Sequence, residues 1–263
     1  MTMWNDLKEI FARSGRYALL CPILFLIPVA LEMIQHAVEI SGGMYVDADG
    51  MRAAGDDPLR LAMGHLKVVA LFLVGYWAAR FLVFGDDPAA ARRIDPRAVR
   101  LFLPVMAWGL FWLLAIQDGP LIAGALGISS ATSSIVLLSV MVASLFFEPL
   151  LSAWKTSAAA ANPAIGFIGS IRLTRPIYFR ALGLSLIAML PLMVAHYALA
   201  YFAVGQSSAL VWGLMAVDSL LVGYMGVTMI ATSYVIARRV ADRAGIDLAA
   251  AGPGRPSAKA AMA

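Results

Sequence analysis

Six apolar stretches of roughly 20 residues each constrain this chain more than any other feature of its sequence. A bilayer has a hydrocarbon core of about 30 Å, which roughly 20 apolar residues cross as a helix. The sequence predicts spans at about 17–38, 65–84, 100–117, 133–153, 179–203 and 210–237. We therefore expect an all-α integral membrane protein with six transmembrane helices.

The composition supports a membrane protein and not a soluble domain. The chain has 263 residues, is 61% hydrophobic and 14% charged, and has a mean hydropathy of +0.81. A soluble domain of this length needs more polar side chains to cover its surface. We expect a single transmembrane domain over residues 1–243 and a flexible cytoplasmic tail over residues 244–263. No cleavable signal peptide is expected, because no small-residue cleavage site follows the first apolar run.

The positions of the basic residues predict the orientation. Most of the 20 Lys and Arg residues lie before the first span, after the second and fourth spans, and after the sixth. Only Arg52, Arg60 and Lys67 lie in the opposite connections, where acidic residues outnumber them. Because Lys and Arg accumulate in cytoplasmic connections, both termini are predicted to be cytoplasmic.

The spans group into three hairpins, and a short polar or amphipathic piece precedes each one. The segments "MWNDLKEIFARSGR" and "NPAIGFIGSIRLTR" both place apolar residues on one helical face. Asx-Pro pairs, such as Asp95-Pro96 and Asn162-Pro163, are typical of helix starts. We expect these pieces to form interfacial helices on the cytoplasmic leaflet.

Four ionisable residues inside the predicted spans form a candidate polar cluster: Glu32, His36, His196 and Asp218. Counting 1.5 Å per residue from the cytoplasmic arginines places them at about 24–30 Å, toward the outer leaflet. One interpretation is a proton-linked or cation site. The other, which we favour at this point, is that these groups pair with one another or reach the outer interface.

Two further sets of charges have candidate roles. Arg80 and Glu148 lie at similar predicted depth near the cytoplasmic side, and the sequence suggests a structural ion pair between them. Arg172, Arg175 and Arg180 lie between the fourth and fifth spans. Positive charge is needed there for topology, and we expect these three arginines to contact anionic lipid headgroups as well.

No motif for catalysis is present in the sequence. It contains no P-loop, GxGxxG, GxSxG or HExxH pattern, and its three histidines lack metal-ligand spacing. The single cysteine, Cys21, excludes an internal disulfide. The basic residues flank apolar runs, as membrane insertion requires, so nucleic acid is not an expected partner. We expect no enzyme activity, cofactor or metal.

The segment "FFEPLLSAWKTSAAAANPAIGFIGSIRLTRPIYFRALGLSL" resembles six-span bacterial membrane proteins of the YciC-like group. That group is related to the membrane domain attached to some glycerophosphodiester phosphodiesterases. The matching residues are Glu148, Ser170, Arg172, Leu173, Thr174 and Arg175. Pro176 stands where the group usually has glycine. The resemblance implies a helical protein of the bacterial inner membrane and carries no catalytic residues to this chain.

Two functions are compatible with this sequence. The first is a non-catalytic inner-membrane protein that associates with lipids or acts as an accessory or structural subunit of a membrane assembly. The second is a small transporter or carrier of a lipid or amphiphile that uses the Glu/His/Asp cluster. The carrier hypothesis predicts that the four cluster residues converge on a water-filled cavity.

Overall fold

The computed structural model describes residues 2–55 and 57–249, and all regular secondary structure in this part of the chain is helical. Six helical stretches are long and apolar enough to cross a membrane. They are Pro22–Ser41, Pro58–Val83, Pro96–Ala125, Ser130–Ala159, Phe167–Ala203 and Ser208–Ala244. The prediction of an all-α chain with six helices long and apolar enough to span a membrane is therefore confirmed. Most of the predicted tail, residues 250–263, lies outside the described residues.

Local chemistry explains where the spans begin and end. The first span, helix α2 (Pro22–Ser41), begins later than predicted, because residues 17–20 still belong to α1 (Met3–Leu20) and Pro22 starts a new helix. Helix α4 (Pro58–Val83) begins earlier than predicted, since the Asp57 carboxylate accepts a hydrogen bond from the backbone N–H of Arg60. Helix α12 (Ser208–Ala244) ends at Gly245, whose φ of 65° is left-handed.

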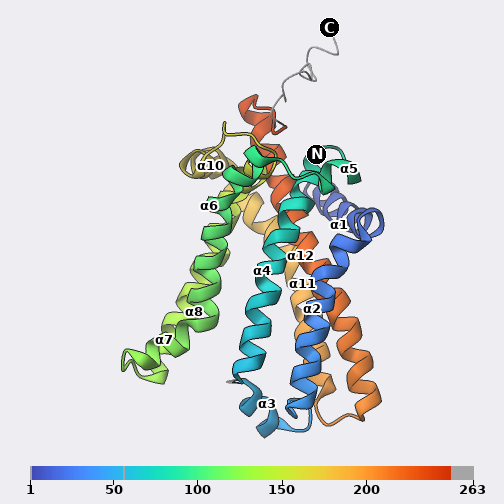
Figure 1. Ribbon diagram of the computed structural model, residues 1–263. Helices are drawn as coiled ribbons and strands as arrows, with labels where there is room; N and C mark the ends of the chain where they lie inside the picture. The colour runs from blue at the N-terminus through green and yellow to red at the C-terminus, as the bar shows by residue number, and fades with distance from the viewer. Residues whose placement is uncertain (1, 56, 250–263) are drawn as a thin grey trace.

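Four long helices form the main bundle: α2, α4, α11 (Tyr178–Ala203) and α12. Helix α12 packs against each of the other three, and α2 packs against α4 (Figure 1). Helix α1 and the last turns of α12 lie at one end of this bundle, here called the terminal end, with α5 (Pro88–Arg92) and α10 (Phe167–Thr174). The opposite, distal end carries α3 (Ala48–Gly55).

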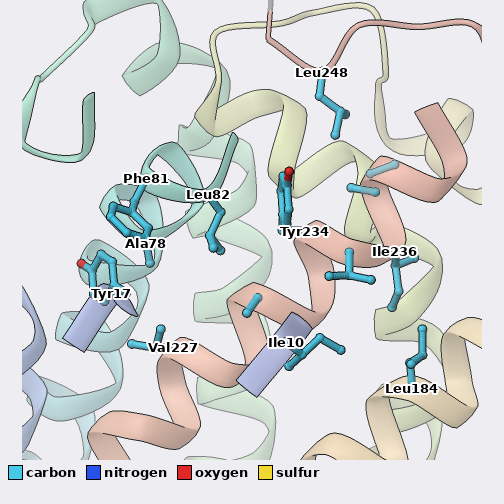
Figure 2. Close-up of a cluster of buried hydrophobic side chains, with 14 of the residues drawn as sticks. Ile10, Tyr17, Ala78, Phe81, Leu82, Leu184, Val227, Tyr234, Ile236 and Leu248 are labelled. Carbon is cyan, nitrogen blue, oxygen red and sulfur yellow. The ribbon is translucent and has the colours of Figure 1, made fainter. Parts of the chain in front are cut away.

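The main apolar core joins α1, α4 and α12 toward the terminal end. Tyr17, Phe81 and Val227 are almost completely buried there, and the rings of Tyr17 and Phe81 meet edge to face at 5.3 Å (Figure 2). Leu248, beyond the last helix, closes the cluster beside Tyr234. This core fixes α1 against the bundle by burial of apolar surface.

A second group of helices stands apart from the bundle, and we call it the arm. It comprises α6 (Pro96–Leu113), the π-helix η1 (Leu114–Asp118), α7 (Gly119–Ala125) and α8 (Ser130–Phe147) (Figure 1). Helix α8 contains no buried residue. At the terminal end, α6 packs on α9 (Ser152–Ala159), and the rings of Trp108 and Phe147 lie 5.8 Å apart in a tilted arrangement. The arm is thus attached mainly at that end.

Two short 3-10 helices complete the described elements. η2 (Glu148–Leu151) leads from α8 into α9, and η3 (Arg175–Ile177) leads from α10 into α11. Each contains a proline in its first turn, Pro149 and Pro176. Since proline has no backbone N–H to donate, it fits this position and marks a change of helix direction.

Candidate functional site

One face of α2 presents a row of polar side chains to the bundle interior. Glu32, Gln35, His36 and Glu39 follow the spacing of neighbouring residues on a helix, and all four are buried. Buried ionisable groups at membrane depth are costly unless they are paired, so their partners decide what the cluster is.

His36 lies at the centre of the cluster. Its Nε2 is 3.0 Å from Oδ2 of Asp218 and 3.5 Å from Oε1 of Glu32. Its Nδ1 is 2.8 Å from Oε2 of Glu39. A neutral imidazole donates from only one nitrogen, so a ring with carboxylates on both sides calls for an extra proton or another cation.

The fifth span adds the second histidine. Nδ1 of His196 on α11 lies 2.7 Å from Oδ1 of Asp218, whose other oxygen faces His36. Asp218 is fully buried, whereas the side chain of His196 is 23% exposed. The structure thus brings together the four residues that the sequence analysis grouped, and His196 connects them to the outer surface of the bundle.

Two basic residues on α4 extend the cluster. Nζ of Lys67 lies 2.6 Å from Oε2 of Glu32, and Nε of Arg60 donates to Oε1 of Glu39 at 2.8 Å. The sequence analysis counted both only as charges of an outer connection. Their position near the start of an apolar helix does not tell in which direction their side chains point, so the sequence carried no signal that they enter the bundle.

Tyr45, in the turn after α2, covers the distal side of the cluster. Its hydroxyl donates to Oε2 of Glu39 at 2.9 Å. Burial, together with the neighbouring Glu39 carboxylate, holds the pKa of the Tyr45 phenol well above its usual value of 10, so the hydroxyl remains a donor. The carboxylate of Glu39 therefore receives hydrogen bonds from several sides.

The cluster reaches well into the helical bundle. Lys67 and Asp218 are nine and ten residues from the distal starts of α4 and α12. At 1.5 Å per residue, this corresponds to a depth of about 15 Å from the helix ends. Glu39 is two residues from the end of α2 at Ser41, so the cluster extends from the distal helix ends to a depth of about 15 Å in the bundle.

A cavity of about 220 Å³ adjoins the cluster on its distal side. Its lining residues are Val38, Glu39, Gly42, Ala53, Ala54, Asp57 and Arg60. Only Glu39 and Arg60 belong to the cluster, so this cavity is not one on which Glu32, His36, His196 and Asp218 themselves converge.

The three arginines of the basic segment have different surroundings. Arg172 and Arg175 are exposed. Arg180 is partly buried, and its guanidinium donates to Oδ2 of Asp6 at 2.6 Å. A contact between Arg180 and Asp6 joins α11 to α1, which the sequence analysis did not anticipate.

The suggested ion pair between Arg80 and Glu148 is wrong. Arg80 donates to the carbonyl oxygens of Ala90 and Ala159, near the ends of α5 and α9, where helix carbonyls carry partial negative charge. Glu148 pairs with Lys155 and accepts from the indole N–H of Trp108 at 2.7 Å. Backbone carbonyls cannot be recognised as partners in a sequence.

The remaining histidine links the arm to the bundle. Nε2 of His65 on α4 lies 2.7 Å from Oδ2 of Asp118 in η1, and the neighbouring Gln117 donates to the carbonyl of Leu61 at 2.9 Å. A π-helix carries an extra residue per turn. Here the two consecutive residues Gln117 and Asp118 both contact α4.

Comparison with protein-family models, with curated proteins and with solved structures gives no match. The interpretation of the site therefore rests on its geometry.

Proposed function

We propose that the protein is a non-catalytic protein of the bacterial inner membrane that associates with lipids and acts as an accessory or structural subunit of a membrane assembly. The arm is the observation that carries this proposal. The fourth span includes α8 of the arm. In its 18-residue apolar stretch, 11% of the residues are buried within the chain, against 61% in the corresponding stretch of the sixth span.

The arm surface requires a partner in the membrane. Exposed leucine, isoleucine, valine and phenylalanine side chains line α8, including Ile135, Leu138 and Phe146. A contiguous apolar surface along a whole helix is covered either by lipid or by another protein. A subunit that docks on the arm would bury it as α12 is buried in the bundle.

The terminal end supports an association with anionic lipid. Arg172 and Arg175 are exposed there, next to the start of the fifth span. In the proposed orientation, with this end in the cytoplasm, each arginine near an anionic leaflet contributes about 1 kcal/mol to membrane binding. The resemblance to the YciC-like group favours the same localisation.

Extraction of the protein into polymer nanodiscs without detergent, followed by native mass spectrometry, tests this proposal. We expect either a stoichiometric second protein or a retained anionic lipid. The double substitution Arg172→Gln and Arg175→Gln should reduce lipid retention, whereas Arg52→Gln in α3, at the distal end, should leave it unchanged. A monomer that retains neither protein nor anionic lipid would contradict the proposal.

A second candidate function, a small carrier of a lipid or amphiphile, is favoured by the buried cluster around His36. Transport proteins place paired ionisable groups inside the membrane as coupling sites. The test is proton uptake by proteoliposomes that carry the protein, measured with an internal pH dye under an imposed potential. Glu32→Gln should abolish a specific signal, and an equal signal from empty liposomes would remove this candidate.

A further inference from the structure

Three side-chain atoms from two helices lie close together in the cluster. They are Oε1 of Glu32 and Nε2 of His36 on α2, and Oδ2 of Asp218 on α12. Each is an atom that binds metals in proteins, and ligand atoms from these three residues all lie within 4.8 Å of one another. We propose that they form a binding site for a divalent transition-metal ion.

The separations between these atoms fit a small coordination sphere. Zinc–nitrogen and zinc–oxygen bonds are about 2.0–2.2 Å long, which places neighbouring ligands of a tetrahedral site about 3.3–3.5 Å apart. Nε2 of His36 is 3.5 Å from Oε1 of Glu32 and 3.0 Å from Oδ2 of Asp218. The third separation, between the ligand atoms of Glu32 and Asp218, is at most 4.8 Å, and binding of the ion would draw these two side chains to the same spacing.

Each proposed ligand is held by a partner on its other polar atom. Oε2 of Glu32 lies against Lys67, Nδ1 of His36 against Glu39, and Oδ1 of Asp218 against His196. In metal sites, such outer partners fix the tautomer and orientation of the ligands. A bound metal would replace the present hydrogen bond between Nε2 of His36 and Oδ2 of Asp218 and would leave these outer contacts in place.

The charges of the cluster favour a bound cation. The three carboxylates of Glu32, Glu39 and Asp218 face two permanent cations, Arg60 and Lys67. With both histidines neutral, one negative charge remains uncompensated in a buried environment, where such a charge is costly. A proton on His36 would balance this charge, whereas a divalent ion on the same nitrogen would leave a net charge of +1 unless a water bound to the ion lost a proton.

The ligand set selects a class of metal. One imidazole with two carboxylates suits Zn²⁺, Mn²⁺ or Fe²⁺, whereas Ca²⁺ takes six to eight oxygen ligands and Mg²⁺ retains most of its water. Three protein ligands leave a fourth position open for water or for a ligand that enters the bundle. Metal-ligand spacing is not visible in the sequence because the third ligand comes from a helix far along the chain.

Metal binding is measured on the whole protein, purified without a histidine tag and reconstituted in nanodiscs of phosphatidylcholine. Isothermal titration with Zn²⁺ should give one site per chain, and Mg²⁺ should not compete. His36→Gln and Asp218→Asn should each weaken Zn²⁺ binding at least about 100-fold, and His196→Gln about 10–100-fold. The matched control is His65→Gln, which removes a carboxylate-paired histidine outside the site and should leave Zn²⁺ binding unchanged.

X-ray absorption of the Zn²⁺-loaded wild-type protein makes the test independent of how the variants fold. We expect one imidazole and oxygen ligands at about 2.0–2.1 Å. Binding with sulfur or with several imidazoles, no stoichiometric binding by folded wild-type protein, or full binding by folded His36→Gln would overturn the proposal. Any of these results leaves the lipid association untouched, because that proposal depends on the arm and on Arg172 and Arg175.

Discussion

Glu9 and Arg238 are 229 residues apart in the chain, and both terminal nitrogens of the Arg238 guanidinium donate to the Glu9 carboxylate at 2.6 Å. Parallel hydrogen bonds of this kind combine charge with fixed geometry. Next to this pair, Asp6 accepts from Arg180 and Arg239. Two carboxylates of α1 therefore hold the start of the chain against α11 and α12, at the terminal end.

Substitution Asp6→Asn should destabilise the fold. The substitution removes the buried negative charge and leaves Arg180 and Arg239 without a counter-charge. Breaking a fully buried ion pair costs about 3–5 kcal/mol of unfolding free energy. We expect a smaller cost here, because both arginines are partly exposed. Thermal unfolding in a mild detergent measures the effect. Asp49→Asn is the control, because the exposed Asp49–Arg52 pair should contribute at most about 1 kcal/mol. Equal melting temperatures for both variants would contradict the conclusion that Asp6 stabilises the fold through its two arginines.

The same contact should make stability dependent on pH. Burial opposes ionisation of Asp6, but the hydrogen bonds and charges of Arg239 and Arg180 outweigh burial and hold the pKa of Asp6 below its usual value of 3.8. A lowered pKa in the folded state means that the stabilisation is present above pH 3.8 and is lost as pH falls through the folded-state pKa. The difference in melting temperature between wild type and Asp6→Asn should therefore be constant near neutral pH and shrink below pH 3.8. A difference that grows on acidification would refute this account.

Gly223 allows α12 to approach α2 closely. A Cβ at Gly223 would lie 2.5 Å from Cγ2 of Val29, a branched side chain that cannot move away easily. Gly223→Ala should therefore cost about 1–3 kcal/mol of unfolding free energy. Gly213 on the same helix has nothing within 4 Å of the corresponding position, and Gly213→Ala should be neutral or slightly stabilising. The free energies of unfolding of both variants, measured under identical conditions, test this difference.

The contact between α4 and η1 should determine how far the arm departs from the bundle. A Cβ at Gly64 would lie 2.5 Å from Nε2 of Gln117, so Gly64→Val should turn the Gln117 side chain away and remove its hydrogen bond to the carbonyl of Leu61. Spin labels at the exposed positions Leu59 and Leu121 should then report a longer or broader distance distribution in pulsed electron resonance. Gly124→Val, a position with open space, is the control. An unchanged distribution in Gly64→Val would show that this contact does not position the arm.

The orientation that the charge distribution predicts has a direct test. In a background with Cys21→Ser, we introduce single cysteines by Asp49→Cys in α3 and Arg92→Cys at the end of α5, which lie at opposite ends of the bundle. A membrane-impermeant maleimide should label position 49 in intact spheroplasts, and position 92 only after permeabilisation. The reverse pattern would place the termini outside.

The buried cluster was partly visible in the sequence. Glu32, His36, His196 and Asp218 are recognisable because ionisable residues in apolar runs are rare. Lys67 and Arg60 were counted only as charges of the outer side, since their distance from the helix start says nothing about the direction in which their side chains point. The partners of Arg80 were not predictable at all, because they are backbone carbonyls.

The sequence alone determined that the chain is all-helical with six apolar segments long enough to span a membrane, because hydrophobic length is a local property and one segment suffices to judge it. Only the tertiary structure decided which faces of these helices meet. It joined α2, α4, α11 and α12 around His36, and it left the arm with little buried surface. The physical reason is that a membrane makes lipid and protein equally apolar surroundings, so helix contacts depend on close packing and on a few polar pairs.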